Sequence, residues 1–161
     1  MADDASATLY DTDFYLWTQA QAAALRARAG SDKTLDYDRL AEEIEDLGKS
    51  DYRAVTSAVR LILEHLYKLH ATRRREPVGH WKREIVNFRD SAARAATPSI
   101  RRMIAGELEP LHAKGAEMAA LDFESYEPDA AIDPARRWTW DEIMGEANDP
   151  LDQAFPLAGD R

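Results

Sequence analysis

The stretch SDYRAVTSAVRLILEHLYKLH, residues 50–70, decides the fold class of this chain. Its apolar side chains recur every three or four positions over nearly five turns, which is the spacing of one face of an α-helix. These side chains are Tyr52, Val55, Val59, Ile62, Leu63, Leu66 and Leu69. We therefore predict a long amphipathic helix here, with Ser50 as its N-terminal cap.

The segments before it show the same periodicity. We expect a first helix that starts at Asp11 or Thr12 and ends at residues 30–32, where Gly, Ser and Asp break the pattern. A second, shorter helix is predicted over about residues 36–47, with Gly48 as its C-terminal cap. Its expected buried stripe is Leu40, Ile44 and Leu47.

Two more helices are predicted after residue 80. One starts near Trp81 and ends at Thr97-Pro98, and Ser99 can cap the next. Pro110 lies inside this last helix, where the proline ring removes a backbone hydrogen bond. We therefore expect a kink or break between Gly106 and Pro110.

The predicted fold is all-α, a bundle of four to five helices formed by residues 11–121. Residues 1–10 are expected to be disordered or extended. Residues 122–161 are rich in proline and acidic residues and are expected to pack on the bundle as an irregular tail. The tail should carry one short helix, because Thr139-Trp140-Asp141-Glu142 has the sequence of a capping box.

Composition excludes several classes of site. The 161 residues contain no cysteine, which rules out disulfides, thiolate metal sites and a cysteine nucleophile. The N-terminus lacks the features of a signal peptide, and no apolar run is long enough for a membrane span. We therefore predict a cytoplasmic protein that does not enter the membrane.

Charge is distributed unevenly along the chain. The net charge is −9, yet residues 60–102 carry eleven Lys and Arg against four Asp and Glu. The candidate anion-binding patch in this basic middle is Arg73, Arg74, Arg75, Lys82 and Arg83. Clustered cations of this kind can contact phosphates, so nucleic acid is one conceivable partner. The alternative is a solvated loop and internal pairing with the acidic flanks, since no aromatic residues interleave the arginines.

Several short strings occur in a characteristic order along the chain. They are Asp13-Phe14-Tyr15-Leu16-Trp17, the string from Leu40 to Gly48, His65-Leu66-Tyr67-Lys68, Trp81 with Ile85 and Arg89, Pro98-Ser99-Ile100, and the string from Trp138 to Ile143. Together they resemble a bacterial family called domain of unknown function 29. The resemblance covers roughly residues 10–145. It departs at Leu69, where an aromatic residue is common, and in the tail after Ile143. The resemblance implies a cytosolic helical bundle and no particular activity.

Polar residues that border the predicted stripes form two candidate clusters. A divalent metal could be held by Glu43, Glu45, His65 and His70, if carboxylates and imidazoles face each other across neighbouring helices. A structural polar cluster could instead consist of Glu43, Glu45, His65, Lys68 and Arg89, in which an ion pair fixes the order of the helices. Each histidine has a plainer interpretation as a hydrogen-bonded residue beside the core.

A third hypothesis concerns Arg60 and His65, whose spacing resembles the motif of HEPN-type helical ribonucleases. In such an enzyme the pair would bind and activate the scissile phosphate. A five-residue step turns a helix by about 140°, however, so the two side chains diverge on a regular helix.

The sequence therefore leaves the activity open between two classes. We expect a noncatalytic interaction or regulatory module, which binds a protein partner or itself and needs no cofactor. The alternative is a helical enzyme, either dependent on a divalent metal or a ribonuclease that uses His65.

Overall fold

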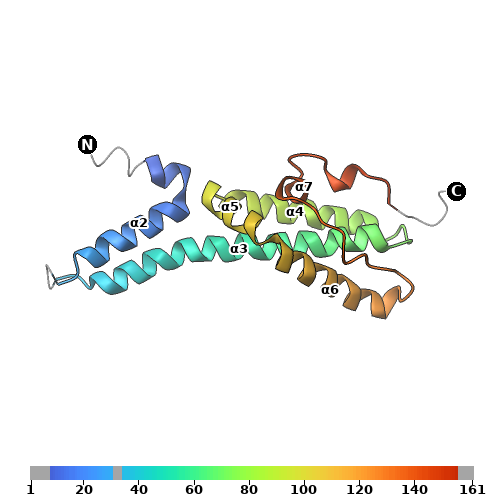
Figure 1. The fold of residues 1–161 in the computed structure, drawn as a ribbon, viewed down its shortest axis with the longest axis horizontal. Coiled ribbons are helices and arrows are strands. Elements are labelled where there is room, and N and C mark those ends of the chain that lie inside the picture. The colour runs from blue at the N-terminus through green and yellow to red at the C-terminus, as the bar shows by residue number, and fades with distance from the viewer. Residues whose placement is uncertain (1–7, 31–33, 156–161) are drawn as a thin grey trace. The chain divides into compact units, whose positions relative to one another are not determined.

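The computed structural model describes residues 8–30 and 34–155 (Figure 1). All regular elements in these ranges are helices, which confirms the all-α prediction. They are α2 (Phe14–Ala27), α3 (Tyr37–Ala71), α4 (Val78–Ala95), α5 (Pro98–Gly106), α6 (Leu108–Tyr126), α7 (Trp140–Met144) and the 3₁₀ helix η1 (Pro150–Asp152). A short helical segment at residues 8–12 precedes α2. Within the described ranges, no helix combines the length and the apolar composition needed to cross a bilayer.

The chain forms two compact units. Of the described residues, the N-terminal unit contains 8–30, 34–55 and 95–103, and the C-terminal unit contains 56–94 and 104–155. Helix α3 contributes its first part to the N-terminal unit and the remainder to the C-terminal unit.

In the N-terminal unit, α2 and the first part of α3 form an antiparallel hairpin (Figure 1). Gly48 lies at their contact: a Cβ atom there would overlap Oγ1 of Thr18 and would stand 3.3 Å from Cδ2 of Tyr15. Thr18 is fully buried. Glycine is therefore needed at position 48 for the close approach of two helices.

The predicted break at residues 48–50 is wrong, because α3 is continuous from Tyr37 to Ala71. Gly48 lies inside the helix and is not a C-terminal cap, and Ser50 is not an N-terminal cap. The stripe also differs from the prediction, since Ala41, Gly48 and Val55 are buried. Leu40 and Leu47 are 40% and 54% exposed.

The start of α2 also differs from the prediction. Asp13, and not Asp11 or Thr12, is the N-cap, and its Oδ1 accepts a hydrogen bond from the backbone N–H of Leu16 (3.1 Å). The same carboxylate accepts hydrogen bonds from the backbone N–H (2.8 Å) and the hydroxyl (2.7 Å) of Ser99. Burial would raise the pKa of Asp13, but these hydrogen bonds outweigh it and lower the pKa. Asp13 thus ties the start of α2 to the start of α5.

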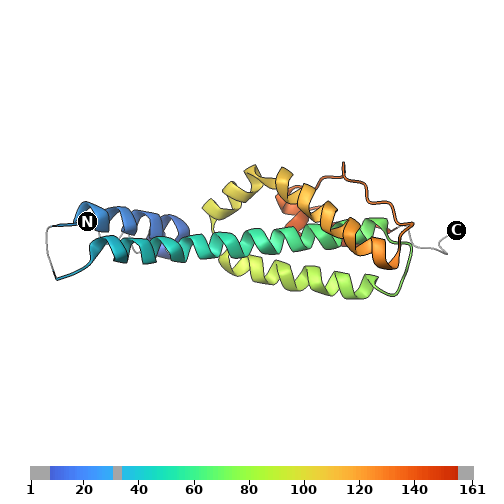
Figure 2. The same ribbon diagram turned by 90° about the horizontal axis from the view of Figure 1, so that it is seen from below.

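In the C-terminal unit, α4 and α6 pack on the second part of α3 (Figure 2). The core residues of α3 are fully buried there, among them Ile62, Leu63, Leu66 and Leu69. Gly115 of α6 allows close contact, because a Cβ atom would lie 3.0 Å from Cβ of Leu63. The predicted interruption before Pro110 is confirmed, since α5 ends at Gly106 and α6 begins at Leu108.

The described tail carries the predicted capping box. The Thr139 side chain accepts from the backbone N–H of Glu142, and the Glu142 carboxylate accepts from the backbone N–H of Thr139. Helix α7 ends at Gly145, whose φ of 72° is the left-handed conformation that glycine adopts without strain. Trp138, Trp140 and Ile143 are buried.

The contact at Gly48 yields a test. In an open helix, Gly→Ala stabilises by about 1 kcal/mol, but Gly48→Ala should destabilise the protein by about 1–3 kcal/mol because the new methyl group overlaps Thr18. Gly79→Ala is the matched control, since nothing lies within 4 Å of the added Cβ. Urea unfolding measures both. The double variant Gly48→Ala/Thr18→Ala should recover part of the loss, and an unchanged stability of Gly48→Ala would contradict the contact.

Candidate functional site

Three polar side chains of α3 are buried in the C-terminal unit. Glu64, His65 and Lys68 are only 8%, 9% and 5% exposed. The ammonium of Lys68 donates to Oε1 of Glu64 at 2.7 Å and forms an ion pair with Asp122 of α6. A buried charge is tolerated when it is paired, so this arrangement stabilises the packing of α3 against α6.

His65 and Arg60 are each engaged within α3. Nδ1–H of His65 donates to the carbonyl of Leu61 (2.8 Å), and the ring packs against Phe88 with 5.7 Å between centroids. Burial lowers the pKa of His65, so the imidazole is neutral near pH 7. Arg60 extends toward Glu64, with 4.0 Å between Nη1 and Oε2. None of these contacts joins Arg60 to His65, as the HEPN-type hypothesis would require.

The proposed metal ligands are likewise held apart. Glu43 and Glu45 lie on the same helix as His65, about six turns before it, and not on a facing helix. Glu43 is exposed, whereas Glu45 pairs with Arg26 at 2.7 Å and with Lys49 at 3.5 Å. The described residues hold no group of three or more His, Cys, Asp or Glu side chains that could bind a metal ion.

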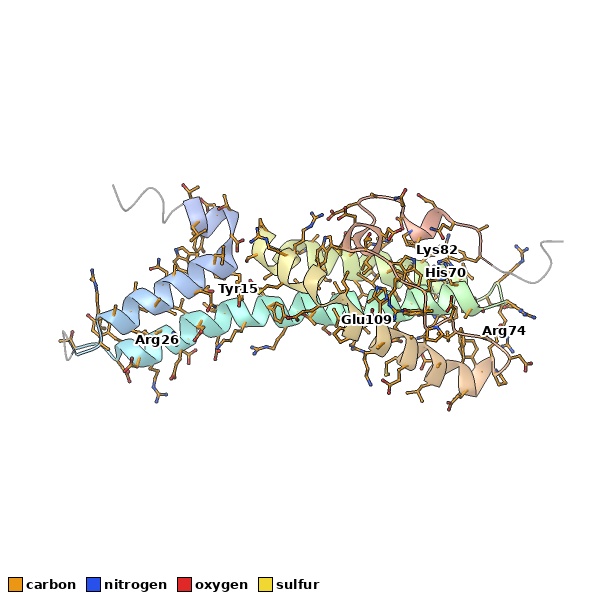
Figure 3. All side chains as sticks on the ribbon, viewed as in Figure 1. Tyr15, Arg26, His70, Arg74, Lys82 and Glu109 are labelled. Carbon is orange, nitrogen blue, oxygen red and sulfur yellow. The ribbon has the colours of Figure 1, made fainter. Side chains whose placement is uncertain are left out.

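His70 lies in an aromatic environment at the end of α3 (Figure 3). Its ring is 5.4 Å from that of Trp138 and 5.2 Å from that of Phe155. Nε2 of His70 is buried and has no hydrogen-bond partner in the part of the chain that the structure describes. Burial, with a smaller contribution from Arg136, lowers the pKa of His70 to about 4.

Arg89 joins α4 to the tail. Its guanidinium forms two hydrogen bonds of 2.8 Å with the carboxylate of Asp149, and it also donates to the carbonyls of Ile143 (2.8 Å) and Glu142 (3.2 Å). A cation at the carbonyl end of α7 complements the helix dipole. Gly145 makes room for it, because a Cβ atom there would lie 2.6 Å from Nη1 of Arg89. Arg89 therefore has a structural role, through Asp149 and not through Glu43 or Glu45.

The predicted anion-binding patch is divided between two hollows. Arg74 lies over the ring of Tyr126 at 5.8 Å and lines a hollow of about 490 Å³ together with Glu76 and Pro77. Lys82 and Arg83 line another of about 490 Å³, and Lys82 donates to the carbonyl of Leu151 (3.0 Å). The side chains of Arg73 and Arg75 are exposed. Carboxylates also line both hollows, namely Glu76 in the first and Glu84 and Asp152 in the second.

A second buried histidine was missed by sequence reasoning. His112 is 1% exposed, and its Nε2–H donates to the carbonyl of Trp138 (2.9 Å). Its Nδ1 lies 3.1 Å from the hydroxyl of Tyr67, which donates to the carbonyl of Arg136 (2.7 Å). The signal was its position one residue after the apolar Leu111. These bonds attach the tail to α3 and α6.

The exposed apolar side chains of the N-terminal unit were also missed. Leu40 and Leu47 lie seven residues apart on α3 and are accessible to solvent. Tyr10, Phe14 and Trp17 form a partly exposed aromatic group, with Tyr10 edge-on to both other rings at 5.4 and 4.8 Å. The sequence shows the heptad spacing of the leucines, but this spacing alone does not distinguish an exposed stripe from a buried one.

The role of Arg89 can be tested by comparison with an exposed arginine. Arg89→Ala leaves a part-buried carboxylate and two carbonyls without their donor, so we expect a loss of about 2–4 kcal/mol. Arg137→Ala should cost far less, because its pair with Glu109 is exposed. Chemical unfolding gives the stabilities, and hydrogen exchange of residues 138–152 reports tail docking. Unaltered exchange in Arg89→Ala would refute this role.

The lowered pKa of His70 predicts a loss of stability in mild acid. The unfolded imidazole titrates near pH 6.5, whereas the folded one resists protonation until about pH 4. The neutral His70 ring therefore contributes fully to the free energy of unfolding above pH 6.5. This contribution decreases by roughly 1 kcal/mol per pH unit as the pH falls from 6.5 to 4. His70→Phe should reduce the pH dependence of the unfolding midpoint between pH 6.5 and 4. The same dependence in variant and wild type would disprove the assignment.

Comparison with known proteins agrees with the helical architecture. Residues 9–147 match the family model described as "Domain of unknown function DUF29". The structure is similar to the crystal structure, at 1.45 Å resolution, of an alpha-helical protein of unknown function from Rhodospirillum rubrum, with a TM-score of 0.77 and 26% identity over 88% of this chain and 92% of that one. No curated protein shows a significant match to the sequence. The chain belongs to the DUF29 family.

Proposed function

We propose that this protein is a noncatalytic interaction module, which binds a protein partner through the hairpin of the N-terminal unit. The observation that carries the proposal is the exposure of Leu40 and Leu47 on the same side of α3. Exposed apolar side chains that gather on one surface are typical of interaction sites. Two leucines one heptad apart are also a common element of helix–helix recognition.

The partly exposed aromatic group of Tyr10, Phe14 and Trp17 belongs to the same hairpin. Tyrosine and tryptophan contribute large contact areas and often dominate the free energy of binding at protein interfaces. Covering one side chain of leucine size with a partner contributes on the order of 1 kcal/mol when about half of it is already buried. Several such side chains together contribute a few kcal/mol toward the entropic cost of association.

The polar residues of the C-terminal unit support the same proposal. His65 and His112 donate to backbone carbonyls, and Arg89 donates to both a carboxylate and two carbonyls. These side chains hold helices and tail together, which is a structural use of groups that an enzyme would employ in chemistry.

The proposal can be tested with two double variants that remove equal numbers of exposed apolar side chains. Leu40→Ser/Leu47→Ser alters the hairpin, and Val86→Ser/Leu121→Ser alters side chains of the C-terminal unit that are each 48% exposed. We expect wild type and the second variant to retain the same stoichiometric partner in quantitative affinity purification. The first variant should lose it while its helical circular dichroism remains unchanged.

Sedimentation velocity of the same three proteins tests self-association. A dimer that only the hairpin variant loses would also support the proposal, with a second copy as the partner. The proposal fails if both variants retain the same proteins and the same oligomeric state as wild type.

A further inference from the structure

The two edges of the α2–α3 hairpin differ in chemistry. The ion pair between Arg26 and Glu45 marks one edge of the contact. At about 100° per residue, Phe14 and Trp17 lie on the flank of α2 opposite Arg26, and Leu40 and Leu47 lie on the flank of α3 opposite Glu45. In an antiparallel pair of helices, the flank of one helix that carries Arg26 adjoins the flank of the other that carries Glu45, and the two opposite flanks adjoin in the same way. These four side chains therefore share the other edge of the hairpin.

This edge forms one apolar surface, which we call the hairpin face. It consists of Tyr10, Phe14, Trp17, Leu40, Ile44 and Leu47. Tyr10 and Leu47 are 51% and 54% exposed, and Ile44 is half-buried. The three aromatic rings contact one another with centroids 4.8–5.6 Å apart. The face follows the seam of two helices, which is where a third helix packs most readily.

Carboxylates border the hairpin face on the side of α3. By the same helical angles, Asp51 falls on the flank of Leu40 and Leu47, and Glu43 lies just beyond them. Glu43 is exposed and lies one helical turn after Arg39. Asp51 is half-buried, and this burial raises its pKa, with no cationic neighbour to offset the effect.

We propose that the hairpin face binds an amphipathic helix of a partner protein whose apolar stripe is flanked by lysine or arginine. This inference rests on the proposed function and specifies the chemistry of its partner. The apolar stripe would cover Trp17, Leu40 and Leu47. Its flanking cations would pair with Asp51 and Glu43.

The same charges disfavour a symmetric pair of this chain on this face. In a two-fold dimer through the hairpin face, both copies would bring Asp51 and Glu43 to the interface. Like charges brought together in this way oppose association. A basic partner meets opposite charges instead.

Two labelled 18-residue helical peptides provide the test with the full-length protein. Both carry the same leucine stripe, and the polar face bears lysine in one peptide and glutamate in the other. We expect the lysine peptide to bind at least tenfold more tightly by fluorescence anisotropy. Asp51→Asn/Glu43→Gln should lower the affinity for the lysine peptide at least threefold, and Leu40→Ser/Leu47→Ser should lower this affinity further.

The matched control is Asp38→Asn/Glu42→Gln, which removes the same charge from the opposite flank of α3 and should leave the affinity unchanged. Equal weakening by the control, or equal affinity for both peptides, would overturn the basic-helix inference. In that case the proposed function stands as long as Leu40→Ser/Leu47→Ser abolishes binding. Binding of the lysine peptide that the leucine variant does not weaken would reflect nonspecific attraction and would overturn the inference. The inference is also overturned if neither peptide binds. A salt-sensitive dimer of the protein that Leu47→Ser abolishes would show that the partner is a second copy of this chain.

Discussion

The buried stripe of α3 is the constraint on which the structure depends. From Ala41 through Gly48 and Val55 to Ile62 and Leu69, one side of this 35-residue helix is covered by other helices. An isolated helix gains little stability from its own hydrogen bonds, so its length requires tertiary packing along much of its course. Each unit supplies that packing for its own part of α3, and glycines permit the close approach at residues 48 and 115.

The same sequence stretch explains where prediction succeeded and where it did not. Residues 52–69 combine a regular period with mostly large aliphatic side chains, so the helix and its buried side could be read directly. Around residue 44 the stripe is made of small residues, with alanine at 41 and glycine at 48. The larger Leu40 and Leu47 lie about 100° away around the helix. A prediction that takes the largest apolar side chains as the buried ones therefore chooses the exposed side of α3. Only the position of Thr18 on α2 shows that Gly48 allows the two helices to approach closely and does not end a helix.

The polar contacts show a related limit. The capping box of α7 was predictable because all its members lie within four consecutive residues. Arg89 could be identified as a structural cation from its position beside Phe88, but Asp149 lies 60 residues later in an irregular segment. The same applies to Asp13 with Ser99, which are separated by 86 residues. Periodicity places a side chain on a flank of its own helix, but it does not identify the partner across a tertiary contact.

The two units use their polar and apolar residues in opposite ways. In the C-terminal unit, Lys68, Arg89 and His112 are buried and bonded to groups far apart in sequence, so each is fixed by the fold. In the N-terminal unit, Leu47 remains exposed and Asp51 is half-buried without a cation within the described residues. Neither arrangement favours the isolated chain, because apolar surface in water and a desolvated, unpaired carboxylate both raise its free energy. A single helix with an apolar stripe and a basic flank would relieve both at once, so the two features have one common physical explanation.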